Sequence, residues 1–230
     1  MLRCGIRNML FFWVALYGLV NLIPGLVSDG ESSCTWLHAG LLAGYTAAIL
    51  FWICRSGRRK EAGLRIPRGL VEAPSFLLPL VVFPMYNLLT NHDLSVEIGF
   101  VLQMLCATLA EELFFRGFLL SALRKHGTVT AVGLTSLTFA LLHCLNFAGN
   151  SESAYVWLQI CCSFCVSLYY CCLVVRFGSI LPCAVAHFLT NITAAESVGG
   201  RWTYIGLICS MLICVIFSLM LIKNVRKRRQ

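Results

Sequence analysis

Charged residues are scarce in this sequence of 230 residues. Asp, Glu, Lys and Arg make up 12% of it and hydrophobic residues 59%, whereas about 25% charged residues are usual in a soluble domain. So few charges leave too little polar surface for a soluble domain of this length. The sequence also lacks internal repeats, low-complexity stretches and long linkers. We therefore expect a single integral membrane domain over residues 1–230.

Long apolar runs with short polar breaks fill the chain. Each run is about 17–25 residues long, enough for a helix to cross about 30 Å of hydrocarbon. The runs lack the two-residue alternation of transmembrane β-barrel strands. The first run follows two arginines but is longer than the core of a usual signal peptide, so we expect a retained helix. The sequence predicts an all-α, polytopic membrane protein of about eight transmembrane helices, at residues 8–28, 34–54, 73–90, 97–121, 128–148, 154–175, 179–195 and 203–222.

Basic residues outnumber acidic ones, and the net charge is +8. If the N-terminus is cytoplasmic and eight spans alternate, all Lys and Arg residues except Arg116 and Arg201 fall in cytoplasmic segments, as the positive-inside rule requires. We expect the basic C-terminal segment "KNVRKRRQ" to contact anionic membrane lipids and not nucleic acid. The compact chain without a targeting extension predicts a plasma membrane protein, bacterial in origin, with both termini cytoplasmic.

Ionisable side chains inside a bilayer are costly, and they usually face a bundle interior or a wet cavity. Three predicted spans carry such groups. The segment "AEELFFRG" contains Glu111, Glu112 and Arg116, "FALLHCLN" contains His143, and "AHFLTN" contains His187 and Asn191. Counting 1.5 Å of rise per residue from the nearest polar breaks places the three groups at similar depth. They are therefore candidates for one shared site.

Spacing within each helix sharpens this hypothesis. Glu112 and Arg116 are four residues apart and can pair on one face, while Glu111 points about 100° away. His187 and Asn191 are also four residues apart and share a helix face. His143 can share a water molecule with Glu111. The Glu112–Arg116 pair alone favours a structural role, and one buried histidine is equally well explained by a bond between helices. The full set is hard to explain by packing alone.

These residues resemble the motifs of a known family. Glu111, Glu112 and Arg116 match the motif E-E-x-x-x-R, and Phe139 and His143 match F-x-x-x-H. His187 and Asn191 match H-x-x-x-N. In this order they are the motifs of the CPBP family of intramembrane proteases (CAAX proteases and bacteriocin-processing enzymes, also called the Abi family). The resemblance covers about 100 residues and implies a protease core at residues 97–195.

The resemblance implies hydrolysis of peptide bonds within the membrane, in membrane-embedded or lipidated substrates that include prenylated CAAX proteins. It implies that Glu111 and His143 activate the attacking water and that His187 and Asn191 stabilise the oxyanion. Structural support of the site would come from the remaining motif residues, Glu112, Arg116 and Phe139. We expect no cofactor. Because relatives were long described as metalloproteases, zinc held by Glu111, His143 and His187 stays open, although the H-E-x-x-H motif is missing.

Two other classes of function stay open at the level of sequence. A bacteriocin self-immunity factor or scaffold of this family would bind a partner without cleaving it. A proton-coupled transporter would also bury glutamate, arginine and histidine, although no inverted repeat is visible. Replacing Glu111 with alanine separates the classes, because a scaffold keeps its function and a protease loses it.

Overall fold

The computed structural model describes residues 13, 15–23, 31–70, 73–90, 97–144, 153–194 and 201–227, and no β-strand occurs among them. Residues 15–23 are helical. The further helices are α2 (Glu31–Arg55), η1 (Pro74–Leu77), α3 (Leu78–Thr90), α4 (Ile98–Glu111), η2 (Glu112–Leu119), α5 (Leu120–Leu123), η3 (Arg124–His126), α6 (Thr128–Leu142), α7 (Ser153–Phe177), α8 (Leu181–Thr193) and α9 (Arg201–Lys227). The predicted all-α fold is confirmed for these residues.

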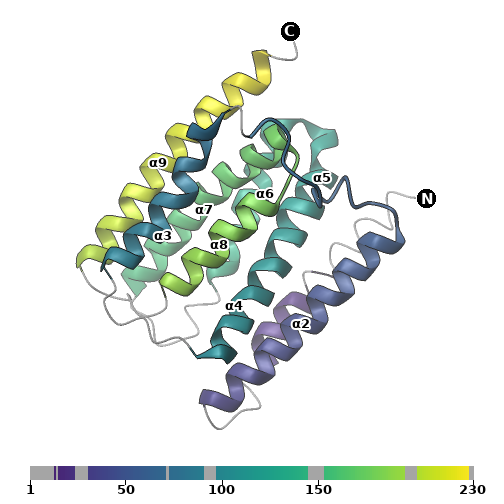
Figure 1. Cartoon of the computed structure of the whole chain (residues 1–230), viewed down its shortest axis with the longest axis vertical. Coiled ribbons are helices and arrows are strands. Elements are labelled where there is room, and N and C mark those ends of the chain that lie inside the picture. Colours follow the sequence, from purple (N-terminus) through teal and green to yellow (C-terminus); the bar gives the residue numbers. More distant parts are fainter. Residues whose placement is uncertain are drawn as a thin grey trace.

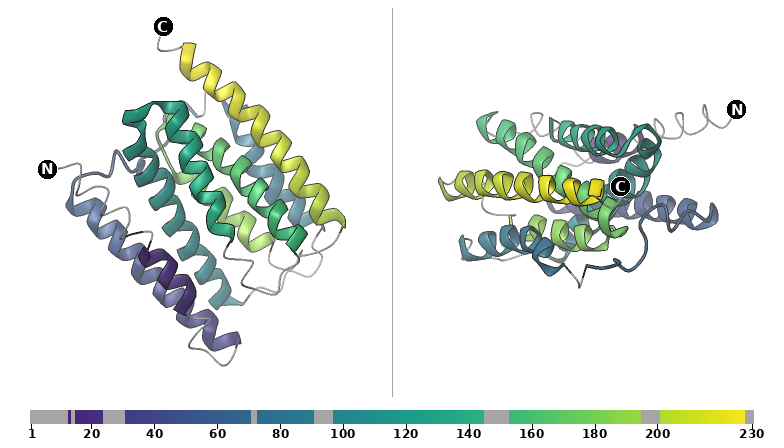
Figure 2. Two further views of the ribbon diagram at one scale, coloured as in Figure 1. Left: turned by 180° about the vertical axis from the view of Figure 1, so that it is seen from behind. Right: turned by 90° about the horizontal axis from the view of Figure 1, so that it is seen from above.

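The long helices run side by side and enclose a common interior (Figure 1). Along the ring, α4 packs on α8, α8 on α3, α3 on α9, α9 on α7 and α7 on α6. The helix η2, which continues α4, contacts α6 and α7 and closes the ring. Helix α2 packs on α4 from outside (Figure 2). This arrangement turns one face of each ring helix toward the same space.

The number of membrane spans differs from the sequence-based prediction. Four of the described helices are long and apolar enough to cross a membrane: Thr35–Arg55, Ile98–His126, Ser153–Phe177 and Tyr204–Lys223. Helices α3, α6 and α8 have 13, 15 and 13 residues. That corresponds to about 20 Å each, less than the roughly 30 Å of a hydrocarbon core. The predicted first span lies partly outside the described residues, so a count of about eight spans is not confirmed.

Helices α3, α6 and α8 are shorter than the predicted spans because the apolar runs also include residues that lie before or after the helix. Pro74 to Leu77 form a 3₁₀ turn before α3, and α6 ends at Leu142 although its apolar run goes on. Proline at the start of a helix is tolerated because the first N–H groups have no partner within the helix. Pro182 follows this rule at the first turn of α8. Hydropathy alone does not separate such turns from the helices beside them.

One end of the bundle is built by the loop between α2 and α3 and the short turn between α7 and α8. The backbone N–H of Arg68 donates to the carbonyl of Phe177 at 3.2 Å, and that of Ile180 donates to Gly63 at 3.1 Å. Arg65 Nε donates to the carbonyl of Gly178 at 2.5 Å. The helices η3 and α9 also end on this side (Figure 1). Most basic loop residues thus gather at one end of the bundle, as the positive-inside pattern predicts.

Gly117 lets this loop approach the helix that carries the glutamates. A Cβ atom at Gly117 would lie 2.9 Å from the carbonyl oxygen of Ala62, closer than real Cβ atoms come to an oxygen. Ala62 itself is buried. The loop therefore fixes the position of η2 from the outside.

Candidate active site

The two adjacent glutamates lie where α4 becomes η2. Glu111 is the last residue of α4, and Glu112 is the first residue of η2, which is a π-helix. π-Helical turns are rare and often mark functional sites, because they turn side chains out of α-helical register. The residues of η2 from Glu112 to Phe118 are all buried. The sequence predicted a helix here but not its π geometry.

Glu112 and Arg116 form the ion pair that their spacing predicted. Arg116 Nη1 lies 2.9 Å from Glu112 Oε1, and both side chains are completely buried. The guanidinium carbon of Arg116 lies 4.1 Å from the centre of the Phe139 ring and 5.4 Å from that of Tyr170. A buried ion pair is tolerable only when further contacts offset its lost hydration. The two aromatic rings supply such contacts through cation–π attraction.

His187 lies between the two glutamates. Its Nδ1 is 2.9 Å from Glu112 Oε1, and its Nε2 is 3.6 Å from Glu111 Oε2. The carboxylate oxygen of Glu112 is ionised beside Arg116 and can only accept a hydrogen bond. Nδ1 of His187 is therefore the donor and carries a proton. Glu112 Oε1 therefore accepts from both Arg116 and His187. This shared oxygen ties α8 to η2 and fixes the orientation of the imidazole.

Asn191 lies one turn after His187 on α8, as the H-x-x-x-N spacing predicted. Its Nδ2 donates to the hydroxyl of Thr108 at 3.3 Å. Thr108 is buried in α4, one turn before Glu112. One N–H of the amide is used in this bond, and the second remains for another acceptor. Thr108 was not singled out by the sequence, because threonine is common in apolar helices.

His143 follows the last residue of α6. Its Nδ1 lies 3.3 Å from the carbonyl oxygen of Phe139, and a carbonyl only accepts, so Nδ1 carries a proton. In the neutral ring this leaves the lone pair on Nε2. The ring of Phe139 lies 5.2 Å from the His143 ring and 6.0 Å from the His187 ring, between centroids. Phe139 thus spaces the two histidines.

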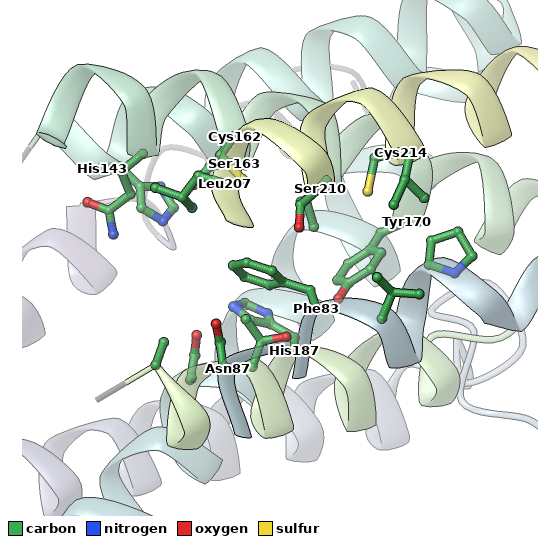
Figure 3. Close-up of a pocket in the computed structure, with 18 of the residues that line it drawn as sticks. Phe83, Asn87, His143, Cys162, Ser163, Tyr170, His187, Leu207, Ser210 and Cys214 are labelled. Atoms are coloured by element: carbon green, nitrogen blue, oxygen red, sulfur yellow. The ribbon is translucent and has the colours of Figure 1, made fainter. Parts of the chain in front are cut away.

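A cavity of about 150 Å³ joins these groups. Five of the seven predicted site residues line it: Arg116, Phe139, His143, His187 and Asn191. The two histidines come from different helices, His143 from the end of α6 and His187 from α8, and Tyr170 and Asn87 also face the space (Figure 3). Glu111 is not a lining residue, and it reaches the group through His187. Glu112 lies behind the wall, as expected for structural support.

The sequence missed Tyr17, whose hydroxyl donates to Glu111 Oε1. Tyr17 comes from the helical residues 15–23 and is buried. It lies 94 residues from its partner. A tyrosine in an apolar run is normally explained by core packing, so nothing in the local sequence distinguished Tyr17.

Zinc was the open alternative for Glu111, His143 and His187. In the part of the chain that the structure describes, no three His, Cys, Asp or Glu side chains converge to hold a metal ion. His187 Nδ1 faces Glu112 at 2.9 Å, and its Nε2 faces Glu111 at 3.6 Å. Zinc would need the nitrogens of both histidines at about 2.0–2.1 Å from one point.

Comparison with known protein families gives a match in the same region. Residues 94–193 match the family model described as type II CAAX prenyl endopeptidase Rce1-like. Neither a curated protein nor a solved structure matches the chain. The matched segment contains α4, η2, α5, η3, α6, α7 and α8, and with them all seven predicted site residues. This match agrees with the resemblance to the CPBP proteases that the three motifs predicted.

Proposed function

We propose that this chain is an intramembrane endopeptidase that hydrolyses peptide bonds of membrane-associated proteins or peptides, including prenylated CAAX-type substrates. The observation that carries the proposal is the convergence of Glu111, His143, His187 and Asn191, from three separate segments, on one cavity and its edge. The family of the matched segment supports an endopeptidase of the CAAX type. Membrane lipids and the lipidated substrate are the partners that follow, and nucleic acid is not among them.

Water activation falls to Glu111 and His143 in this mechanism. The carboxylate of Glu111 or the free Nε2 of His143 takes a proton from water as the water oxygen attacks the carbonyl carbon of the substrate. The carbonyl π electrons move onto its oxygen. When the tetrahedral intermediate collapses, the C–N bond breaks and the leaving nitrogen takes the proton back from the base. The products are a new carboxyl group and a free amine.

The oxyanion is stabilised by His187 and Asn191. Asn191 has a second amide N–H beyond the one that Thr108 accepts. Nδ1 of His187 already donates to Glu112, so its Nε2 can donate to the oxyanion only from the imidazolium. Donors fixed in a site with little water stabilise developing charge by several kcal/mol, roughly 2.7–4 kcal/mol for one donor.

Glu112, Arg116 and Phe139 hold this machinery in place. Arg116 is balanced by Glu112 and covered by the ring of Phe139. The same ring packs beside both histidines. Their substitution should disturb geometry and stability together, whereas substitution of Glu111 should remove chemistry alone.

The orientation that fits this proposal places the basic end of the bundle and both termini in the cytoplasm, in a bacterial plasma membrane. The basic loop between α2 and α3 lies at the same end as η3 and the end of α9. Anionic lipids on the cytoplasmic leaflet attract such segments by about 1 kcal/mol per basic residue near the surface. Labelling of single cysteines from either side of sealed vesicles tests this orientation.

Cleavage of a defined lipidated peptide tests the proposal. The purified protein in detergent is incubated with a farnesylated peptide that ends in a CAAX sequence, and mass spectrometry detects the released tripeptide. Wild type should cleave, while Glu111→Ala and His143→Ala should not. The control His126→Ala, an exposed histidine of η3, should cleave like wild type.

A chelator and added zinc form the second arm of this experiment. Cleavage that survives the chelator agrees with the side-chain mechanism. Cleavage that is lost with chelator and restored by zinc would overturn that mechanism and keep the peptidase. A folded wild type that cleaves neither this peptide nor a membrane-peptide library would overturn the function and favour partner binding without cleavage.

A further inference from the structure

The helical residues 15–23 bring the hydroxyl of Tyr17 to the candidate base, Glu111. This hydroxyl donates to Oε1 of Glu111, while the other oxygen of the same carboxylate, Oε2, faces His187 at 3.6 Å. The two oxygens of Glu111 are therefore differently engaged. One is bound from the N-terminal side of the molecule, and the other is directed to the proposed reaction site.

Tyr17 is held firmly by aromatic packing. Its ring lies 5.5 Å from the ring of Tyr45 on α2, and Tyr45 in turn makes an edge contact with Trp13 at 5.6 Å. The hydroxyl of Tyr45 donates to the backbone carbonyl of Trp13 at 3.1 Å. All three side chains are buried. The ring of Tyr17 therefore has little freedom to leave Glu111.

A chain of polar side chains fixes the same segment to α4. Asn21 Nδ2 donates to the carbonyl of Tyr17 at 2.8 Å, and Asn21 Oδ1 accepts from His38 Nε2 at 3.1 Å. His38 Nδ1 accepts from Gln103 Nε2 at 2.8 Å. Gln103 belongs to α4, the helix that ends at Glu111. Residues 15–23 lie beside α2 (Figure 2). These bonds hold residues 15–23, α2 and α4 in one register, with the hydroxyl of Tyr17 at the carboxylate of Glu111.

We propose that Tyr17 is a positioning residue for the peptidase reaction. By binding Oε1, its hydroxyl fixes the rotation of the Glu111 carboxylate and leaves Oε2 directed to the attacking water. The inference rests on the proposed function, and it adds a residue that lies outside the family-matched segment 94–193. Its consequence is that the Rce1-like segment alone is an incomplete site. The N-terminal helical residues complete it.

The test compares Tyr17→Phe with Tyr45→Phe in the full chain. Each variant removes one hydroxyl and keeps the aromatic ring, and only the hydroxyl of Tyr17 bonds Glu111. With the farnesylated peptide, Tyr17→Phe should lower kcat by about 10- to 100-fold at unchanged KM, the range of a hydrogen bond to a charged group. Tyr45→Phe should keep kcat near that of wild type. Thermal unfolding in detergent should give similar Tm values for the two variants.

A double variant separates positioning from general loss of structure. Shortening the carboxylate in Glu111→Asp already breaks the contact with Tyr17, so adding Tyr17→Phe should lower the residual kcat little further. Equal losses in Tyr17→Phe and Tyr45→Phe, or additive losses in the double variant, would overturn the proposal. Wild-type cleavage with an unaffected Tyr17→Phe would overturn this inference alone. An inactive wild type would overturn the proposed function and this inference with it.

Discussion

The two walls of the cavity differ in chemistry. The wall formed by η2, α6 and α8 carries Arg116, His143 and His187, whereas the described residues of α3, α7 and α9 that line the cavity include no Asp, Glu, Lys, Arg or His. The second wall is built mainly from apolar side chains with isolated amide and hydroxyl groups, such as Asn87 and Ser210. Guanidinium and imidazole groups are thus concentrated on one side of the cavity among its described lining residues.

The family-matched segment includes all of one wall of the cavity and only part of the other. The whole polar wall lies within residues 94–193, while α3 and α9 lie outside them. The matched segment therefore contains the residues of the proposed chemistry but not the cavity-lining residues of α3 and α9. We infer that substrate preference depends on helices that the family model does not include.

The largest expected effect is on the polar wall. Glu111→Gln keeps the size of the side chain and removes its basicity, so kcat for the farnesylated peptide should fall by roughly 10²- to 10⁴-fold. The half-buried side chain makes no buried ion pair with Arg116, so Tm should stay close to that of wild type. Steady-state kinetics and thermal unfolding of the same sample check both parts. A fully active Glu111→Gln would remove the chemical distinction between the walls.

The next effect concerns the stability of the polar wall. Arg116→Leu leaves Glu112 buried and without its charge partner, which should lower the free energy of unfolding by about 3–5 kcal/mol. Denaturant unfolding in mixed micelles measures it. The matched control is Glu61→Gln, which breaks the exposed pair of Glu61 with Arg58 and should change the midpoint little. Equal shifts for the two variants would contradict a special role for the buried pair.

A smaller effect is expected on the apolar wall. Phe83 lines the cavity from α3, and Phe83→Ala should raise KM about tenfold or more with little change in kcat, because it removes contact that ground and transition states share. Kinetics with peptides of different prenyl length check this. Leu89→Ala, an exposed site on the same helix, is the control. A large loss of kcat in Phe83→Ala would show that this wall takes part in the chemistry.

The smallest effect is at the seam between the walls. Asn87 Nδ2 on α3 donates to the hydroxyl of Thr193 on α8 at 3.3 Å, and Asn87 is buried. Asn87→Ala should lower stability by about 1 kcal/mol, the net value of one hydrogen bond. Thr193→Val should cost a similar amount, and the double variant should lose less than the sum. Additive losses would mean that the bond does not join α3 to α8.

Much of the site could be predicted from spacing alone. The four-residue intervals between Glu112 and Arg116 and between His187 and Asn191 predicted shared helix faces, and the structure confirms the ion pair at 2.9 Å. Similar depth in three helices predicted one shared site, and Glu111 and His187, from two of these helices, lie 3.6 Å apart. These predictions succeeded because helical periodicity and the cost of burying charge act within short stretches of sequence.

Other features depend on partners far away in the chain. Tyr17, Thr108 and Tyr170 were not predicted, because their residue types are ordinary in apolar helices and only their neighbours give them a role. The count of about eight spans is not confirmed in the described residues for a related reason, since apolar runs conceal turns such as Pro74–Leu77. The roles of individual site residues remain predictions that the experiments above test.

The sequence by itself determined that this chain is helical and apolar, which groups are too polar to face lipid, and which of them share a helix face. The cost of burying charge and the helical repeat are local constraints, so both can be read from the residues of a single helix. The tertiary structure decided that Glu112 accepts from both Arg116 and His187, that η2 is a π-helix, and that a tyrosine from the N-terminal segment binds Glu111. Those choices follow from how helices pack around one cavity, and packing is a property of the whole chain.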